Sequence, residues 1–168
     1  MLISAELVRN HLDYTTWASK RLLAAAATLS PEELSRDFKT ADHSILGTLA
    51  HIYAADRVWL ARFTGAPGGP FITDADRSLA VLQSDWPALL ERWRQWAQPL
   101  TDEATQQILS FKDTKGNPYS EPVWQLILHV VNHGSHHRGQ VSGFLRALGH
   151  TPPPLDLVAY YRDRARVS

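Results

Sequence analysis

Apolar residues recur at intervals of three and four along four long stretches of the chain, which is the spacing of one face of an α-helix. The stretches cover about residues 4–29, 42–65, 78–100 and 121–148. Each is longer than the mean helix of a globular protein, and each also carries polar residues on its opposite face. The pattern therefore predicts four long amphipathic helices.

Residues that start and end helices flank these stretches. Ser4 is suited to cap the first helix, and either Asp42 or Ser44 begins the second. The run 65–70 (GAPGGP) cannot continue a helix and ends the second one. Residues 30–33 (SPEE) combine a capping residue, a first-turn proline and a glutamate at the capping-box position, so they predict a further short helical turn.

The inner faces of the helices follow from the same spacing. The third helix carries a broad apolar stripe with three tryptophans, Trp86, Trp93 and Trp96, which we interpret as core or dimer surface. For the first helix, the residues expected on the inner face are Leu7, His11, Tyr14, Ala18, Leu22 and Ala25.

Two shorter segments complete the pattern. Residues 106–120 contain KGNP after a short apolar run, which predicts a small hairpin or ordered loop before the last long helix. Residues 155–161 predict a short docked helix at the end of the chain. We therefore expect an all-α fold, a four-helix bundle with short extra helices, and a single domain over residues 1–168.

Composition narrows the possible functions. Seventeen basic and seventeen acidic residues cancel, so the chain lacks the basic surplus that is typical of nucleic-acid binding. There is no cysteine, which excludes disulfides, thiolate metal ligands and a cysteine nucleophile. The N-terminus does not resemble a signal peptide, and no apolar run approaches the ~20 residues of a membrane span. We expect a soluble cytoplasmic protein in which nitrogen and oxygen atoms hold any metal.

Five of the eight histidines fall between residues 129 and 150. His133 and His137 are four residues apart, so on a helix they lie on the same side, one turn apart, and can share one ion. His51 of the second helix, among small residues, is the best third ligand. Three such ligands leave an open coordination position, as in reactive sites. A hydrogen-bonded pair of core histidines explains the spacing of His133 and His137 equally well.

The remaining polar candidates receive lesser roles. His129 is expected beside the ligands, His136 at the edge of the apolar stripe, and His11 in the core, whereas His43 and His150 are expected to be exposed at helix ends. Gln140 can orient a ligand or bridge two helices, and Tyr14 can face the cavity or pack in the core. Arg138 is expected at the surface or in an interface salt bridge. No inner carboxylate is evident, because Asp56 lies on another side of its helix from His51, so we name no general base.

The chain resembles the DinB/YfiT-like family of metal-dependent proteins. The resemblance spans nearly the whole sequence and rests on four segments: 13–22 (DYTTWASKRL), 48–53 (TLAHIY), 129–140 (HVVNHGSHHRGQ) and 148–160 (LGHTPPPLDLVAY). Each segment alone is weakly specific, but the combination is specific.

The resemblance implies a four-helix bundle, commonly dimeric, with a divalent metal at His51, His133 and His137. Relatives of this kind include thiol S-transferases that use bacillithiol or mycothiol, and the metal-binding domain of a mycothiol-dependent maleylpyruvate isomerase. The implied partners are a small-molecule substrate, a low-molecular-weight thiol and a second copy of the chain, with no nucleic acid and no membrane.

Three functions are consistent with these features. The first is a metal-dependent transferase that uses a low-molecular-weight thiol, the second is a metal-dependent hydrolase of a small molecule, and the third is a non-catalytic protein that binds metal or a ligand. Imidazole ligands suit zinc, nickel, copper and iron, and zinc or nickel is the expected cofactor.

Overall fold

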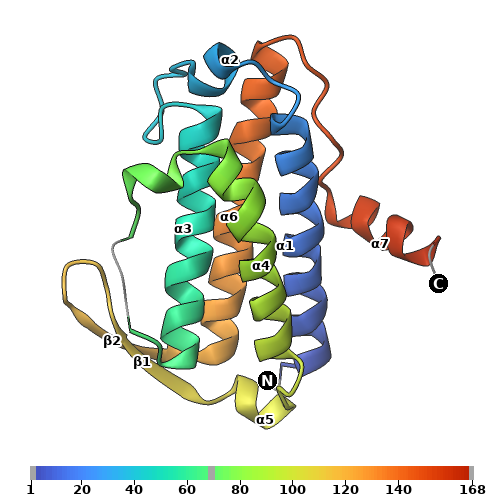
Figure 1. Ribbon diagram of the computed structural model, residues 1–168. Coiled ribbons are helices and arrows are strands. Elements are labelled where there is room, and N and C mark those ends of the chain that lie inside the picture. The colour runs from blue at the N-terminus through green and yellow to red at the C-terminus, as the bar shows by residue number, and fades with distance from the viewer. Residues whose placement is uncertain (1–2, 68–70, 167–168) are drawn as a thin grey trace.

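The structure, a computed structural model, describes residues 3–67 and 71–166 and consists mainly of four long helices packed side by side (Figure 1). Helices α1 and α3 each contact both α4 and α6, so α1 lies diagonally across the bundle from α3. Helices α1 and α6 run in one direction, and α3 and α4 run in the other (Figure 1). The predicted all-α four-helix bundle is confirmed. The helices are α1 (Ala5–Ala26), α3 (Ile45–Thr64), α4 (Leu79–Ala97) and α6 (Val123–Ala147).

Short elements close the two ends of the bundle and its flank (Figure 1). Two strands pair antiparallel with Ser110 opposite Ser120, which confirms the hairpin that was one of the two predictions for this segment. The last helix packs against α1 through Tyr160, which is buried with its ring 5.8 Å from that of Tyr14, so the predicted docked tail helix is confirmed. The short elements are α2 (Pro31–Ser35), η1 (Asp74–Asp76), α5 (Asp102–Thr105), β1 (Ile108–Lys112), β2 (Pro118–Pro122) and α7 (Leu157–Ala165).

The helices begin and end at the residues that the capping pattern predicts. The Ser4 hydroxyl accepts a hydrogen bond from a first-turn amide of α1, and Ser30 forms a reciprocal capping box with Glu33 at the start of α2. Ser44, one of the two predicted starts, caps α3 by accepting from the Gly47 amide at 3.0 Å. Gly65 ends α3 with a left-handed φ of 65°, a conformation that a glycine adopts without strain.

The hydrophobic core runs along the bundle between the four helices. Trp86 and Trp93 are buried in it, which confirms their core interpretation. The predicted inner face of α1 is wrong at Leu7, which is 44% exposed, because the buried face of α1 centres on Val8 and Leu12 instead. Over the described residues, no helix combines the length and the apolar composition needed to cross a membrane.

Candidate metal centre

His51 lies in the middle of α3 on a face made of small side chains. Gly47, Thr48, Ala54 and Ala55 around it are buried, and the His51 side chain itself is 22% exposed. The small neighbours let α6 approach closely enough for an imidazole from α3 to reach an imidazole from α6. The rings of His133 and His137 occupy the space that these small residues leave beside His51.

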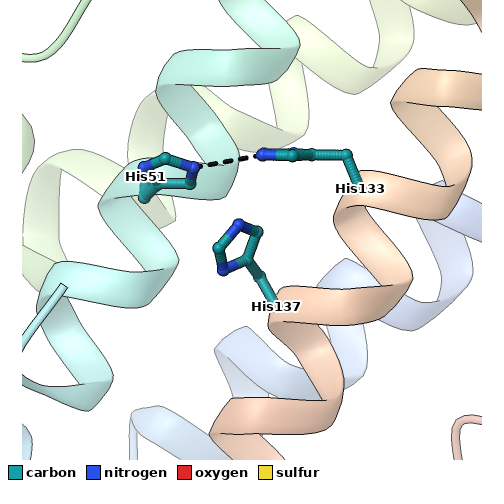
Figure 2. A group of neighbouring side chains, drawn as sticks. All are labelled: His51, His133 and His137. Carbon is teal, nitrogen blue, oxygen red and sulfur yellow. Dashed lines mark hydrogen bonds between the residues drawn. The ribbon is translucent and has the colours of Figure 1, made fainter. Parts of the chain in front are cut away.

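The three predicted histidines come together between α3 and α6, and their rings face one another (Figure 2). Nε2 of His51 lies 3.1 Å from Nε2 of His133, and the His137 ring centroid lies 4.4 Å from that of His51 and 4.5 Å from that of His133. One nitrogen from each ring lies within 4.8 Å of the other two. The spacing of His133 and His137 on one helix and the choice of His51 as the third residue thus correctly predicted which side chains meet.

The Nδ1 atoms of two of these rings face protein oxygen atoms. Nδ1 of His137 donates a hydrogen bond of 2.7 Å to Oε1 of Gln140, which lies nearly one turn further along α6. Nδ1 of His51 lies 3.3 Å from Oδ1 of Asp42, and the other carboxylate oxygen of Asp42 lies 3.8 Å from Nδ1 of His137. A proton on Nδ1 leaves the lone pair on Nε2, so these contacts favour the tautomer that presents Nε2 to a metal.

Asp42 is the site residue that sequence reasoning missed, and it corrects the expectation that no carboxylate accompanies the histidines. It lies in the connection between α2 and α3, where Lys39 and His43 adopt left-handed φ angles of 60° and 62°. Such angles are uncommon outside glycine and reverse the chain direction locally. The only sequence signal was the place of Asp42 just before α3, which suggested a cap rather than a contact with imidazoles.

Burial favours the neutral form of two imidazoles of the site, His51 and His133. Desolvation, followed by the neighbouring His137 and His51, lowers the pKa of His133 to about 4. Desolvation also lowers the pKa of His51, although the Asp42 carboxylate opposes this change. A histidine must be neutral to bind a metal. Both side chains are therefore neutral at neutral pH, as metal binding requires.

The arrangement fits a divalent metal with nitrogen ligands. Two nitrogens that each lie ~2.1 Å from one ion are separated by about 3.0–3.4 Å in octahedral or tetrahedral geometry, and the Nε2 atoms of His51 and His133 already meet this requirement. Three imidazoles from two packed helices match the donor set of catalytic zinc sites, which leave a coordination position open, whereas structural zinc sites do not. The three histidines could hold such an ion.

Two other histidines of α6 lie next to these rings but do not belong to the group whose nitrogen atoms come together. His129 is exposed, although its ring packs edge-on against Trp59 at 5.3 Å, with its centroid 5.8 Å from that of His133. His136 is exposed, although its ring lies 5.0 Å from that of His137. Both positions agree with the predictions that His129 flanks the ligands and that His136 lies at the edge.

The remaining histidines lie elsewhere. His11 contacts the Leu7 carbonyl of its own helix at 2.8 Å, so the expectation of a core histidine is wrong, and His43 is exposed as predicted. His150 is only partly exposed, because its Nε2 contacts a Glu33 oxygen at 2.7 Å.

Arg138 corrects another expectation, because it is buried rather than at the surface. Its side chain is 1% exposed, its guanidinium lies over the Tyr14 ring at 5.4 Å, and it donates to the Ser135 hydroxyl at 3.1 Å. Arg138 was expected at the surface, but α1 covers its side of α6. Asp56 is also buried and accepts a hydrogen bond of 2.9 Å from Nε1 of Trp86. Its carboxylate therefore binds a core side chain and not the histidines.

The fold and the site define a class: a four-helix bundle in which two helices bring three histidines together at a candidate metal centre. The sequence model of the DinB family matches residues 1–165, and the chain belongs to this family. Protein DinB of Bacillus subtilis (strain 168) is 24% identical over 156 residues, which cover 88% of this chain and 90% of that protein.

A solved structure shows the same fold. The crystal structure of a DinB-like protein from Bacillus cereus ATCC 10987 superposes with a TM-score of 0.68 at 24% sequence identity, covering 92% of this chain and 99% of that one. The predicted family resemblance is therefore confirmed together with the bundle.

Proposed function

We propose that the protein binds one divalent metal ion, zinc or nickel, through His51, His133 and His137, and acts as a metal-dependent transferase that uses a low-molecular-weight thiol. The observation that carries the proposal is the convergence of these three imidazoles, with one nitrogen of each within 4.8 Å of the others. The contacts of Gln140 and Asp42 with the Nδ1 atoms favour the tautomers that a metal requires.

In the proposed reaction, the metal ion and the side chains of the protein have different roles. A divalent ion supplies a positive charge that lowers the pKa of a thiol or water at its open position and so provides a nucleophile near neutral pH. The chain holds three imidazoles in place, packs Phe71 edge-on against His51 at 5.3 Å, and leaves the His51 side chain 22% exposed to solvent. Because the sequence contains no cysteine, the attacking sulfur comes from a free thiol rather than from a side chain.

A pocket further along α3 than the histidines offers room for a small electrophilic substrate. It has a volume of about 270 Å³, and Phe71, which packs against His51, also lines it. Val58 in its wall lies seven residues after His51 on the same face of α3, which places it ~10 Å along the helix axis. Arg62 and Lys112 contribute positive charges to the lining, and Asp113 contributes a negative charge.

The test combines metal content with thiol transfer. Wild-type protein loaded with zinc or nickel is incubated with bacillithiol or mycothiol and with monochlorobimane, from which the sulfur displaces chloride while a C–S bond forms and a proton is released. We expect thiol-dependent fluorescence that disappears in His137→Ala. The matched control is His136→Ala, which makes the same change at the adjacent, exposed histidine and should retain activity.

Each outcome has a defined meaning. Turnover with either thiol that requires both the metal and His137 supports the transferase. Stable metal binding without turnover by either thiol rejects the transferase and favours the hydrolytic or the non-catalytic alternative. Turnover that is equal in wild type and His137→Ala shows that the three histidines are not the reactive site.

A further inference from the structure

A single carboxylate faces the outer nitrogens of two histidines that come from different helices. The oxygens of Asp42 lie 3.3 Å from Nδ1 of His51 on α3 and 3.8 Å from Nδ1 of His137 on α6. The side chain of Asp42 is 19% exposed and that of His137 is 12% exposed, so solvent only partly screens the charge of the carboxylate. Asp42 is therefore placed to act on both rings from behind their Nε2 atoms.

We propose that Asp42 is a positioning residue of the metal centre: its carboxylate accepts a hydrogen bond from Nδ1–H of His51, fixes the ring in the tautomer that presents Nε2, and offsets part of the charge of a bound cation. This inference rests on the proposed metal site. A carboxylate behind a histidine ligand raises the basicity of that ligand and sets its orientation.

The two rings do not depend on Asp42 equally. His137 already donates to Gln140 at 2.7 Å, and its distance of 3.8 Å from Asp42 is too long for a hydrogen bond. The contact of 3.3 Å between His51 and Asp42 is only slightly longer than a typical hydrogen bond. Loss of the carboxylate should therefore disturb the tautomer of His51 more than that of His137.

The connection before α3 holds Asp42 in place from both sides. On one side, Phe38 stacks on Phe144 of α6 with ring centroids 4.3 Å apart, and its amide donates to the His43 carbonyl at 2.7 Å. On the other side, the Asp42 carbonyl accepts from the Ser44 amide at 2.7 Å. The left-handed conformations of Lys39 and His43 stay in place because these contacts fix the chain around them.

The first turn of α3 also makes room for this connection. Gly47 packs so closely against the Asp42 carbonyl that a Cβ at position 47 would overlap the carbonyl oxygen. The close approach that a glycine permits is what brings the Asp42 carboxylate within reach of His51 on the same helix. The position of Asp42 is therefore built into the backbone rather than left to a flexible loop.

The experiment compares Asp42→Ala and Asp42→Asn with Asp37→Asn. Asp37 is an exposed carboxylate in the same connection that binds Lys39, so its variant controls for loss of a negative charge there. Zinc affinity is measured by competition with a chromophoric chelator. We expect Asp42→Ala to bind zinc about ten- to a hundred-fold more weakly, Asp42→Asn to be affected less because its amide oxygen still accepts, and Asp37→Asn to stay within about twofold of wild type.

A second measurement separates this inference from the proposed metal site. Imidazole ¹⁵N spectra of the metal-free proteins report the tautomer of each ring, so they test Asp42 even if no metal binds. We expect the Nδ1–H tautomer of His51 to dominate in wild type and to lose its dominance in Asp42→Ala, while the tautomer of His137 is retained through Gln140. If wild type binds zinc but Asp42→Ala matches both its affinity and its His51 tautomer, the positioning role is wrong and the metal site stands.

Discussion

Replacing the buried Asp56 with asparagine should change how the stability of the protein depends on pH. Asp56 is 2% exposed, and burial raises its pKa from 3.8 to about 6 even though the Trp86 hydrogen bond and the nearby Arg138 oppose the rise. At about 1.4 kcal/mol per pKa unit, this rise corresponds to a penalty of about 3 kcal/mol for the ionised carboxylate in the folded protein.

The direction in which the free energy of unfolding changes with pH depends on whether the folded or the unfolded protein binds the proton more tightly. Below about pH 4, Asp56 is protonated in both the folded and the unfolded protein, and it causes no penalty. Between about pH 4 and pH 6, the folded protein binds the proton more tightly than the unfolded protein does, so the free energy of unfolding falls as the pH rises. Above about pH 6 the penalty is complete. An asparagine has the same shape and does not titrate.

The assay is urea unfolding of wild type and Asp56→Asn with metal removed by a chelator, at several values from about pH 4.5 to about pH 7.5. All other ionisable groups are the same in both proteins, so the difference between the two proteins isolates Asp56. We expect the advantage of Asp56→Asn to grow by about 2 kcal/mol across this range, because about 1 kcal/mol of the penalty is already present at about pH 4.5. The control is Asp85→Asn, an exposed carboxylate on α4. A difference that stays constant with pH would refute the reasoning.

Two further predictions concern the metal centre. Gly47→Ala should lower the free energy of unfolding by about 1–3 kcal/mol and weaken zinc binding, because the added Cβ overlaps the Asp42 carbonyl and displaces the connection that carries the carboxylate. Urea unfolding and zinc titration check this, and Gly139→Ala, where a Cβ meets nothing within 4 Å, is the control that should lose neither property. Zinc affinity should fall less than about tenfold from pH 7.5 to pH 6, because the pKa values of His133 and His51 are lowered, whereas three imidazoles with ordinary pKa values of about 6.5 would lose roughly fifty-fold. Calorimetric titration at both pH values measures the ratio, and the larger loss would contradict the neutral state assigned to these rings.

Local signals in the sequence predicted most of the bundle and the three histidines. Capping by Ser4 and Ser44 depends on side chains that bind the amides of their own helix, so the sequence contains the information directly. Likewise, the four-residue spacing of His133 and His137 determines that both rings leave α6 on one side. The prediction of His51 as the third residue required only the further expectation that the inner faces of two helices meet.

The parts that could not be predicted depend on packing between distant segments. The contact of Asp42 with His51 requires two left-handed residues in a connection without periodicity, and no local pattern indicates them. Arg138 lies on a side of α6 that a single helix would leave in water, but α1 covers that side and its Tyr14 ring lies under the guanidinium. Helical spacing determines which residues share a face, whereas the neighbouring helices determine which faces are buried.

Bound metal per chain is the most direct test of the account. Wild type, His51→Ala, His137→Ala and the control His136→Ala are loaded with zinc, desalted and analysed for metal content, and circular dichroism confirms their helix content. The account predicts about one ion per chain in wild type and in His136→Ala, and almost none in the other two variants with their helices intact. Equal metal content in all four proteins would contradict the assignment of the three histidines as ligands.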